Sequence, residues 1–558
     1  MQNKNNLINI KDLSINFGIA SAVKQADMII KQGQIMGLVG ESGSGKSTLA
    51  NAIIGLLPHA ANIIGGTMDF EGRDMLKFTK NQWQELRGRE ISYVSQDPMS
   101  ALNPTLRIGQ LMVDIQYGSD DTNEVKLKCA LDALEQVRMP NSKSRLDMYP
   151  HELSGGQKQR VCIAMAIMSR PKLLIADEIT TSLDATLEVQ IIKLLKELQS
   201  EIGCAMLFVT HHLTVVEALC DEVTVMYNGV IRETGSVQKV FSSPSDDYTK
   251  SLLLCDPARI QEKCRRLPVM SKLELKSISD PKMDKARIDL LAVPALSIDN
   301  LRVNFTKQRS LIDLLQRRPG MCIEAVKDAT LSVAIGETVA LVGESGSGKS
   351  TIARAVFRLV KAQGGRVLFD DADLLKATPH EMRAVRNRMS MMMQDPIGSL
   401  SPRTTIGAAV VEPYIISGQS SDLNLREEAN RLLELVGLPS DFSNRYPHEL
   451  SGGQARRVGV ARALALNPKL VIADEPTAGL DVSIQGEVFN LLASLREKMK
   501  LSILIITHNL HVVRHLADRI VIIYQGQIVE TGDTETIMSN PAHDYTKKLL
   551  AANLQAKY

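Results

Sequence analysis

Several residue classes are scarce in this sequence. Aromatic residues make up 4% of the chain and include one tryptophan, Trp83, which argues against a platform that stacks nucleic-acid bases or a membrane barrel with aromatic girdles. Lys and Arg number 65 against 63 Asp and Glu, so the formal net charge is only +2. Because no strong overall field is present, we expect no nucleic acid as the main partner.

Long hydrophobic runs are also missing. Apolar stretches such as 205–209 and 339–342 have the length of a strand, whereas a membrane-spanning helix needs about 18 consecutive apolar residues. Residues 1–12 lack the basic segment, apolar core and cleavage site of a signal peptide. We therefore expect a chain that does not cross a bilayer itself and lies in the cytoplasm.

Cysteine is infrequent as well. The seven cysteines are scattered and odd in number and form no Cys-x-x-Cys pair, so neither a disulfide framework nor a zinc site is predicted. The rest of the composition is ordinary for a folded protein, with 44% hydrophobic and 23% charged residues. At 558 residues the chain is too long for one hydrophobic core, and two or more domains are expected.

The sequence contains one set of motifs twice. The repeated segments are GESGSGKST at 40–48 and 343–351, YPHELSGGQ at 149–157 and 446–454, and DYTK at 247–250 and 544–547. Since each pair keeps nearly the same spacing, one domain is predicted at 5–255 and a second at 294–558. Residues 256–293 are polar and punctuated by prolines, which indicates a linker with at most short ordered pieces.

Within each copy, short apolar runs alternate with longer helical patterns. The runs 35–39, 173–176 and 205–209 are rich in aliphatic residues, and 187–198 is a helical stretch. Such alternation is typical of βαβ units around a mostly parallel sheet that is covered on both faces. The predicted fold class is therefore α/β in each half.

Each copy also has a glycine-rich loop between an apolar strand and a helix. Glycines let the backbone curl so that N–H groups and the helix N-terminus point at phosphates, while the lysine adds charge and the serine after it offers a hydroxyl to Mg²⁺. A turn without function is the alternative, which two copies in matching contexts make negligible. The predicted nucleotide-binding residues are Gly40, Glu41, Ser42, Gly43, Ser44, Gly45, Lys46, Ser47 and Thr48, with Gly343, Glu344, Ser345, Gly346, Ser347, Gly348, Lys349, Ser350 and Thr351.

Two acids end an apolar strand in each copy. The first acid, Asp177 or Asp474, is placed to hold Mg²⁺ together with the loop serine, Ser47 or Ser350. The second, Glu178 or Glu475, is placed to polarise an attacking water. If only one such pair were present, two solvated acids without a catalytic role would be a reasonable alternative. Two pairs at the same spacing after a phosphate loop predict catalysis.

LSGGQ follows at 153–157 and 450–454. With these motifs together, the chain resembles a pair of fused ATP-binding subunits of an ABC transporter. The resemblance implies two P-loop NTPase domains in tandem, each with a mostly parallel sheet and a helical subdomain. It also implies that LSGGQ opens a helix whose N-terminus faces the γ-phosphate held by the opposite domain, through Ser154 and Gly156 or Ser451 and Gly453.

The same resemblance assigns further residues. Gln96 and Gln394 match the glutamine that senses Mg²⁺, and His211 and His508 match the histidine that contacts the γ-phosphate. Asp184 and Asp481 match an acid that signals across the domain interface, while Phe17 and Phe305 match a position that stacks on adenine. For the two phenylalanines, a core aromatic within a strand is an equally good interpretation.

Both halves retain the lysine, both acids, the signature and the histidine, so two hydrolysis-competent sites are predicted. The departures from the family pattern are modest. Ile179 replaces the usual proline after the catalytic acid, which leads us to expect a looser turn and a slower first site. His212 and Asn509 stand where aspartate commonly follows the histidine.

Outside the ATP motifs, the halves resemble the first and second ATPases of dipeptide, oligopeptide and nickel importers, and the whole resembles fused ATPases of glutathione-type importers. The segment 306–322 is an insertion with four basic residues, expected to be a solvated loop and less readily a contact to lipid headgroups. The cysteine-rich segment of some relatives is missing after 247–249, so no iron–sulfur cluster is expected.

The implied machine binds ATP and Mg²⁺ and lies peripherally on the cytoplasmic face of the cell membrane. Its expected partners are two integral-membrane permease subunits and an extracytoplasmic solute-binding protein, and the sequence leaves the solute open. Two alternatives are a soluble twin ATPase acting on ribosomes or DNA and a regulatory or scaffold protein. The proline-punctuated linker of mixed charge and the absence of zinc cysteines weigh against the first, and the two catalytic glutamates weigh against the second.

Overall fold

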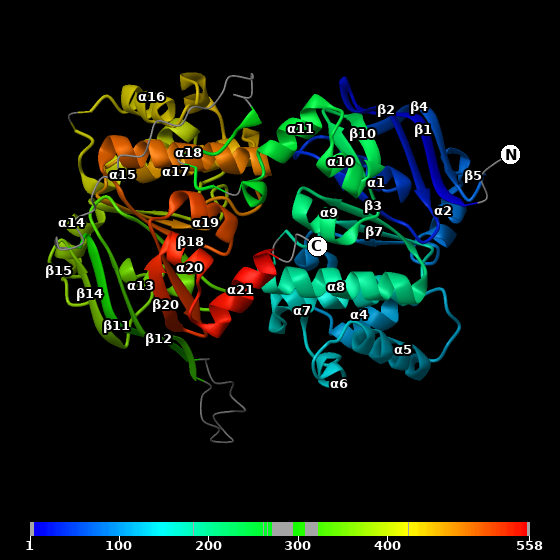
Figure 1. The fold of residues 1–558 in the computed structure, drawn as a ribbon, viewed down its shortest axis with the longest axis horizontal. Coiled ribbons are helices and arrows are strands. Elements are labelled where there is room, and N and C mark those ends of the chain that lie inside the picture. Colours follow the sequence, from blue (N-terminus) through cyan, green and yellow to red (C-terminus); the bar gives the residue numbers. More distant parts are fainter. Residues whose placement is uncertain are drawn as a thin grey trace. The chain divides into compact units, whose positions relative to one another are not determined.

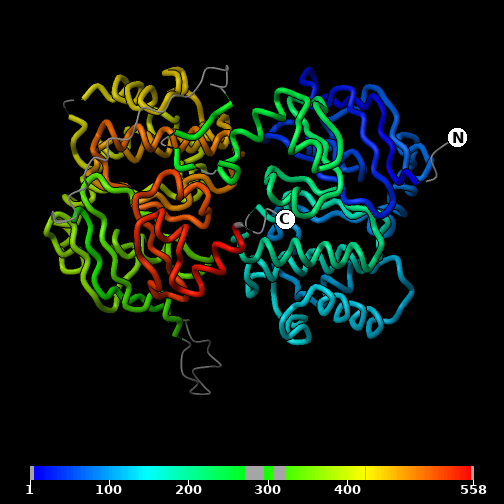
Figure 2. Tube along the Cα trace, in the orientation of Figure 1, coloured from blue at the N-terminus to red at the C-terminus, as the bar shows by residue number. Residues whose placement is uncertain are grey.

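The computed structural model describes residues 5–181, 183–260, 262–264, 266–270, 294–306, 322–421 and 423–554. These residues separate into two units, one ending at Arg259 and the other running from Ile260 to Asn553. The chain is coloured from blue to green through the first unit and from green to red through the second (Figure 1), and the same course is traced in Figure 2. Each unit is described by itself.

The first unit is built around a central sheet with the strand order β10-β9-β3-β8-β7-β6. Its strands are β3 (Ile35–Val39), β6 (Ile91–Val94), β7 (Leu173–Asp177), β8 (Ala205–Thr210), β9 (Glu222–Tyr227) and β10 (Val230–Ser236). The strands from β9 to β6 pair in parallel and only β10 is antiparallel within this sheet. All residues of β3, β7 and β8 are buried, as expected for parallel strands covered on both faces.

An antiparallel sheet completes the core of the first unit, with the strand order β2-β1-β4-β5. Its strands are β1 (Asn6–Phe17), β2 (Ala20–Lys31), β4 (Ala61–Phe70) and β5 (Arg73–Asp74). Alternate residues of β1 are buried and pack with α1 (Lys46–Ile53) and the strands of the central sheet into one hydrophobic cluster. This packing fixes the loop that leads from β3 into α1.

The helices of the first unit fall into two groups. Figure 1 shows α4, α5, α6 and α7 gathered away from the antiparallel sheet, as a helical subdomain. That subdomain contains α3 (Pro98–Ala101), α4 (Ile108–Asp114), α5 (Asn123–Gln136), α6 (Ser142–Arg145) and α7 (Gly155–Ile167). The other helices are α2 (Lys80–Leu86), α8 (Ala185–Ile202), α9 (Leu213–Leu219), α10 (Val237–Ser242) and α11 (Asp247–Leu254), and short 3-10 turns lie at Met75–Lys77, Pro150–Glu152 and Pro257–Arg259.

The second unit repeats this plan. Its central sheet has the order β16-β17-β18-β13-β19-β20 and its antiparallel sheet the order β12-β11-β14-β15. The strands are β11 (Leu296–Thr306), β12 (Cys322–Val333), β13 (Thr338–Val342), β14 (Gly364–Phe369), β15 (Ala372–Asp373), β16 (Met389–Met392), β17 (Leu470–Asp474), β18 (Ser502–Thr507), β19 (Arg519–Tyr524) and β20 (Gln527–Asp533). The α/β class with mostly parallel sheets predicted from the sequence is confirmed in both halves.

The helices of the second unit also correspond to those of the first. They are α13 (Lys349–Val356), α14 (Pro379–Arg386), α15 (Ile406–Ser417), α16 (Leu425–Leu435), α17 (Gly452–Leu464), α18 (Val482–Met499), α19 (Leu510–Leu516), α20 (Thr534–Ser539) and α21 (Asp544–Leu554), with 3-10 turns at Ser440–Asn444 and Pro447–Glu449. Helices α15, α16 and α17 share a hydrophobic cluster with residues of β17 and β18. Both helical subdomains expected from the resemblance are therefore present.

Part of the segment assigned to the linker packs on the second unit. Leu267 is 5% exposed and lies against Phe489 and Val512. Its backbone N–H donates to Asn490 Oδ1 at 2.8 Å, and Asn490 Nδ2 donates back to the Leu267 carbonyl at 2.7 Å. Residues 271–293 of the predicted linker lie outside the described residues. The boundary between the two units, at Arg259 and Ile260, therefore lies near the start of the predicted linker, and the residues that follow it pack on the second unit.

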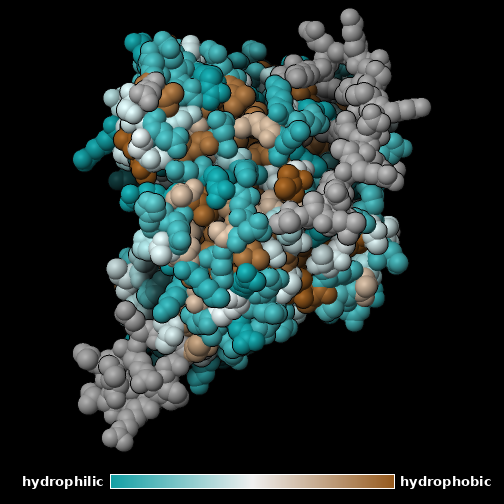
Figure 3. Space-filling view, turned by 90° about the vertical axis from the view of Figure 1, so that its left-hand side faces the viewer, coloured by the Kyte–Doolittle hydropathy of each residue, from teal (hydrophilic) through white to brown (hydrophobic). Residues whose placement is uncertain are grey.

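The insertion predicted at 306–322 also falls largely outside the described residues, which include only its ends, Thr306 at the end of β11 and Cys322 at the start of β12. Among the helices that the structure describes, none is both long and apolar enough to span a membrane. The face of the second unit seen in Figure 3 is mainly hydrophilic, with hydrophobic residues in small separate groups.

Candidate functional site

The two phosphate loops have the backbone that their glycines predict. Gly45 and Gly348 precede α1 and α13 at φ of 101° and 105°, in the left-handed region that favours glycine. A Cβ at either position would lie 2.4 Å from a backbone carbonyl oxygen of the neighbouring strand. At Gly40 and Gly343 it would lie 2.0 and 2.2 Å from one. No other residue type fits these four positions without moving the backbone.

The loop lysines are buried and point back into their own loops. Lys46, which is 4% exposed, donates from Nζ to two carbonyl oxygens of its loop at 2.8 and 2.9 Å. Lys349, which is 7% exposed, makes the same two contacts at 2.7 and 2.8 Å. The hydroxyls of Ser44 and Ser347 are buried in these loops without a hydrogen-bond partner among the described residues. The positive charge of the loop lysine and the unpaired hydroxyl of the loop serine are together suited to bind a phosphate group.

Oxygen ligands gather beside each loop. The Ser47 hydroxyl donates to Asp177 Oδ1 at 3.3 Å, and the Ser350 hydroxyl donates to Asp474 Oδ1 at 3.1 Å. Burial raises the pKa of both aspartates above its ordinary value. A divalent cation would favour their ionised form, and hydroxyl and carboxylate oxygens are the ligands that Mg²⁺ takes. The residues fit the metal that the sequence assigns to them.

The glutamates predicted to be catalytic contact the predicted histidines. Glu178 Oε1 lies 3.3 Å from His211 Nδ1, and Glu475 Oε1 lies 2.9 Å from His508 Nδ1. Burial alone would raise the pKa of Glu178, but the hydrogen bond and charge of His211 outweigh it, so this pKa lies below its usual value. An ionised carboxylate held in place by a ring nitrogen is suited to accept a proton from water.

The turn that carries each glutamate has the same shape in both halves. Glu178 and Glu475 have φ of 48° and 49°, a conformation that costs a non-glycine residue about 1 kcal/mol. Ile179, in place of the usual proline, is 1% exposed. The backbone of Glu178 thus matches that of Glu475, and the looser turn at Ile179 and the slower first site stay predictions.

The two family glutamines differ. Gln96 donates from Nε2 to Glu178 Oε2 at 2.8 Å, which completes a cluster of Gln96, Glu178 and His211. Gln394 is exposed and makes no hydrogen bond within the part of the chain that the structure describes. The structure thus brings one predicted glutamine to its site and leaves the other apart from Glu475.

The signature segments begin α7 and α17 as capping boxes. Ser154 accepts a hydrogen bond from Gln157 N at 3.4 Å, and Ser451 accepts one from Gln454 N at 3.3 Å. Gly156 and Gly453 belong to the first turns of these helices, where anions are favoured. Their contact with the loop of the opposite half stays a prediction.

The two phenylalanines lie at the exposed ends of strands. Phe17 ends β1 and is partly exposed, and Phe305 in β11 is 43% exposed. Neither belongs to a hydrophobic core, so the interpretation as core aromatics is wrong. Stacking on adenine stays a prediction.

Two side chains near the first site were not singled out from the sequence. The Tyr93 hydroxyl donates to Asp177 Oδ2 at 2.9 Å, and Glu188 Oε1 lies 3.0 Å from His212 Nδ1. Both contacts join residues far apart in the chain. No local motif indicates these contacts. The one available signal is that the two copies differ at this position, with Tyr93 in the first half and Met391 in the second.

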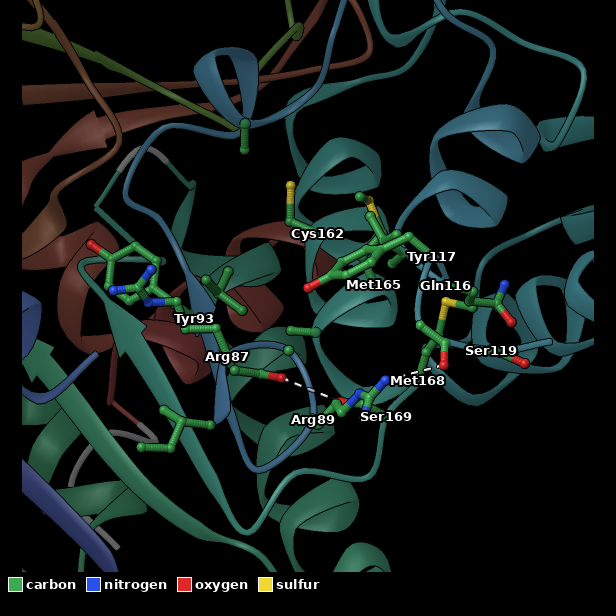
Figure 4. Close-up of a pocket in the computed structure, with 18 of the residues that line it drawn as sticks. Arg87, Arg89, Tyr93, Gln116, Tyr117, Ser119, Cys162, Met165, Met168 and Ser169 are labelled. Atoms are coloured by element: carbon green, nitrogen blue, oxygen red, sulfur yellow. Dashed lines mark hydrogen bonds between the residues drawn. The ribbon is translucent and has the colours of Figure 1, made fainter. Parts of the chain in front are cut away.

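Tyr93 also lines a pocket of about 650 Å³ between the central sheet and the helical subdomain of the first unit. Figure 4 shows Arg87, Arg89 and Tyr117 around this pocket, with Met165 from α7 on its wall. Arg89 donates to the Gly118 carbonyl at 3.1 Å and so holds the loop after α4 over the pocket. Because the Tyr93 hydroxyl contacts Asp177, the Tyr93 side chain connects a group bound in this pocket to Asp177.

The second unit has a pocket of about 630 Å³ in the matching region. Its lining is more basic than that of the first. The residues include Arg358, Arg383, Arg386 and Arg462, with Glu412 and Ile416 of α15. The two surfaces thus differ in chemistry although they stand at matching places.

Comparisons with known proteins identify the family of the chain. A family model described as ABC transporter matches residues 23–181 and 326–478, and one described as oligopeptide/dipeptide transporter, C-terminal region matches 529–557. The glutathione import ATP-binding proteins of Shigella boydii serotype 4 and Escherichia coli K12 are each 38% identical, over 98% of this chain and 89% of their own length. A solved dimer of the ATP-binding cassette MJ0796 with ADP and Pi is 28% identical, with a TM-score of 0.38, and covers 43% of this chain and 98% of its own.

Proposed function

The chain belongs to the ABC transporter family as the ATP-hydrolysing subunit of an importer, and we propose that its solute is a small peptide or a related compound such as glutathione. One observation carries the catalytic part of this proposal. Each half has a buried loop lysine, a serine–aspartate pair and a glutamate–histidine pair around one loop. Two complete sets predict two sites that hydrolyse ATP.

Each of these residues has a separate proposed role at its site. When bound, MgATP supplies the phosphoryl group that water attacks. Lys46 and the loop N–H groups would hold the phosphates, and Ser47 and Asp177 would hold Mg²⁺. The ionised Glu178 would orient the water and accept its proton, while His211 keeps the carboxylate in place. Lys349, Ser350, Asp474, Glu475 and His508 would do the same at the second site.

The signature helices would complete the sites from the opposite half. In a head-to-tail pairing, Ser451 and Gly453 would face the phosphates held by the first loop, and Ser154 and Gly156 those held by the second. Because both halves belong to one chain, such a pairing would be intramolecular and the effective concentration of the partner half would be high. One chain would then carry both sites.

The partners follow from the family and from the surface. Two integral-membrane permeases would dock at the pockets beside Tyr93 and Arg462, with this chain on the cytoplasmic face of the membrane and a solute-binding protein outside. The relatives favour this function over a soluble twin ATPase that acts on ribosomes or DNA. The different linings of the two pockets favour two permeases with different docking segments.

Reconstitution tests the proposal. The chain is co-expressed with its two permeases, purified in detergent and placed in liposomes, and ATP-dependent uptake of labelled glutathione and dipeptides is measured. The matched control is the double variant Glu178→Gln/Glu475→Gln, in which both sites keep the shape of the side chain. Uptake that needs ATP and disappears in the control supports the proposal. Recovery with ribosomes or nucleic acid and without integral proteins would overturn it.

A further inference from the structure

His212, directly after the catalytic histidine, forms a contact that the second half lacks. Its Nδ1 lies 3.0 Å from Oε1 of Glu188, in the first turn of α8. Helix α8 is capped by Asp184, whose Oδ1 accepts from Leu187 N at 3.0 Å. The pair therefore ties the loop of the catalytic histidine to the beginning of α8.

The second half uses neutral residues at the same two places. Asn509 Oδ1 accepts from His511 N at 3.1 Å and from Val512 N at 3.4 Å, so its side chain caps α19. Gln485, at the position of Glu188, donates from Nε2 to the Leu480 carbonyl at 2.8 Å. His212 caps nothing at the start of α9 and points to Glu188 instead. The first half therefore has a contact between His212 and Glu188 where the second half has a helix cap by Asn509.

Acidic groups face His212 from several elements. They are Glu188 on α8, Asp256 after α11 and Glu178 at the end of β7. Burial lowers the pKa of His212, but these carboxylates outweigh it, so that pKa is raised above its ordinary value. The basic Arg259 lies 3.9 Å from Asp256 and reduces the contribution of Asp256 to the raised pKa of His212. The ring also meets His211 edge to face, with centroids 4.5 Å apart.

We infer that His212 is a positioning residue that, while protonated, holds the His211 loop against α8 through Glu188. This inference rests on the proposed roles of His211 and Glu178 at the first site. When His212 loses its proton, the pair loses its ionic attraction and keeps at most a hydrogen bond between neutral imidazole and carboxylate, so the ring that packs against His211 is held less firmly. The first site then loses activity as the pH rises through the raised pKa of His212, and the second site, with Asn509 and Gln485, does not.

The first test is the pH profile of ATP hydrolysis by the full chain with its permeases. His212→Asn, which copies the second half, and Glu188→Gln, which keeps the shape of the side chain, are compared with the parent. Each variant is expected to lower activity near pH 6.5 by about fivefold and to remove the fall in activity at alkaline pH. An unchanged profile in both variants overturns the inference.

A transplant provides the matched control. Asn509→His alone places a histidine opposite the neutral Gln485 and should leave the alkaline limb as it is in the parent. Asn509→His with Gln485→Glu recreates the pair in the second half and should make the alkaline fall steeper. A single variant that acts as strongly as the double variant contradicts a role for the pair.

Thermal unfolding separates this inference from the proposed function, because it needs no hydrolysis. A histidine whose pKa is raised on folding adds stability that is full below the unfolded pKa, about 6.5, and is lost as pH rises through the folded pKa. The parent should therefore melt above His212→Ala, which adds no helix cap, at pH 6, and the difference should shrink as the pH rises toward 9. Absence of ATPase in every chain would refute the proposed function, whereas a melting difference that is constant with pH would refute the ion pair.

Discussion

The two halves of this protein share their phosphate chemistry and differ in what surrounds it. Lys46 and Lys349 make the same contacts within their loops, at nearly the same distances. Around the first site, Tyr93 reaches Asp177 and Gln96 reaches Glu178, whereas Met391 and Gln394 make no matching hydrogen bonds among the described residues. Under the proposed function, the shared set would carry out hydrolysis, and the residues that differ would control when each site acts.

The largest expected effect comes from removing the proposed catalytic carboxylates one at a time. Glu178→Gln and Glu475→Gln each replace the group proposed to accept the proton from water, and each should lower ATP hydrolysis about a hundredfold or more if the two sites work as a coupled pair. Steady-state phosphate release by the complex with its permeases measures this.

Nucleotide binding provides the control, because an amide keeps the shape of the carboxylate and the affinity for ATP should be retained. Full activity in either single variant would contradict two coupled, competent sites. A smaller loss in Glu178→Gln than in Glu475→Gln would sharpen the comparison, since it would indicate that the first site contributes less.

A smaller effect is expected from Tyr93→Phe. The variant removes the hydrogen bond to Asp177 Oδ2 and keeps the ring in the pocket. A hydrogen bond to a charged group contributes about 1.5–3 kcal/mol, and solvent that enters beside Asp177 replaces part of it. We expect the Mg²⁺ concentration that supports half-maximal hydrolysis to rise about threefold, as measured by Mg²⁺ titration of the ATPase.

Met391→Leu in the second half is the matched control, because its side chain makes no hydrogen bond to Asp474. It should leave the Mg²⁺ requirement unchanged. Equal responses in the two halves would show that Tyr93 has no special part in holding Asp177, and that the difference between the halves at this strand is one of packing alone.

The sequence predicts what is local and misses what depends on the fold. The phosphate loops, the strand-end acids and the signature are contiguous motifs, so the roles of Lys46, Asp177 and Ser154 can be predicted from the sequence alone. The hydrogen bond from Tyr93 joins strands distant in the chain, and Leu267 falls within the predicted linker because the prolines nearby outweigh one apolar residue. For the phenylalanines, strand position alone could not distinguish an exposed edge from a core.

The smallest expected effect separates His212 and Asn509, the residues that follow the two histidines predicted to contact the γ-phosphate. Asn509→Ala removes the side chain that caps α19 and should lower the free energy of unfolding of the second unit by about 1 kcal/mol at any pH between 6 and 9. His212→Ala removes no cap, because His212 caps nothing at α9, and its cost should instead shrink as the pH rises. Urea unfolding at pH 6, 7.5 and 9 measures both. A cost for Asn509→Ala that varies with pH, or one for His212→Ala that does not, would mean that the two positions have the same structural role despite their different contacts.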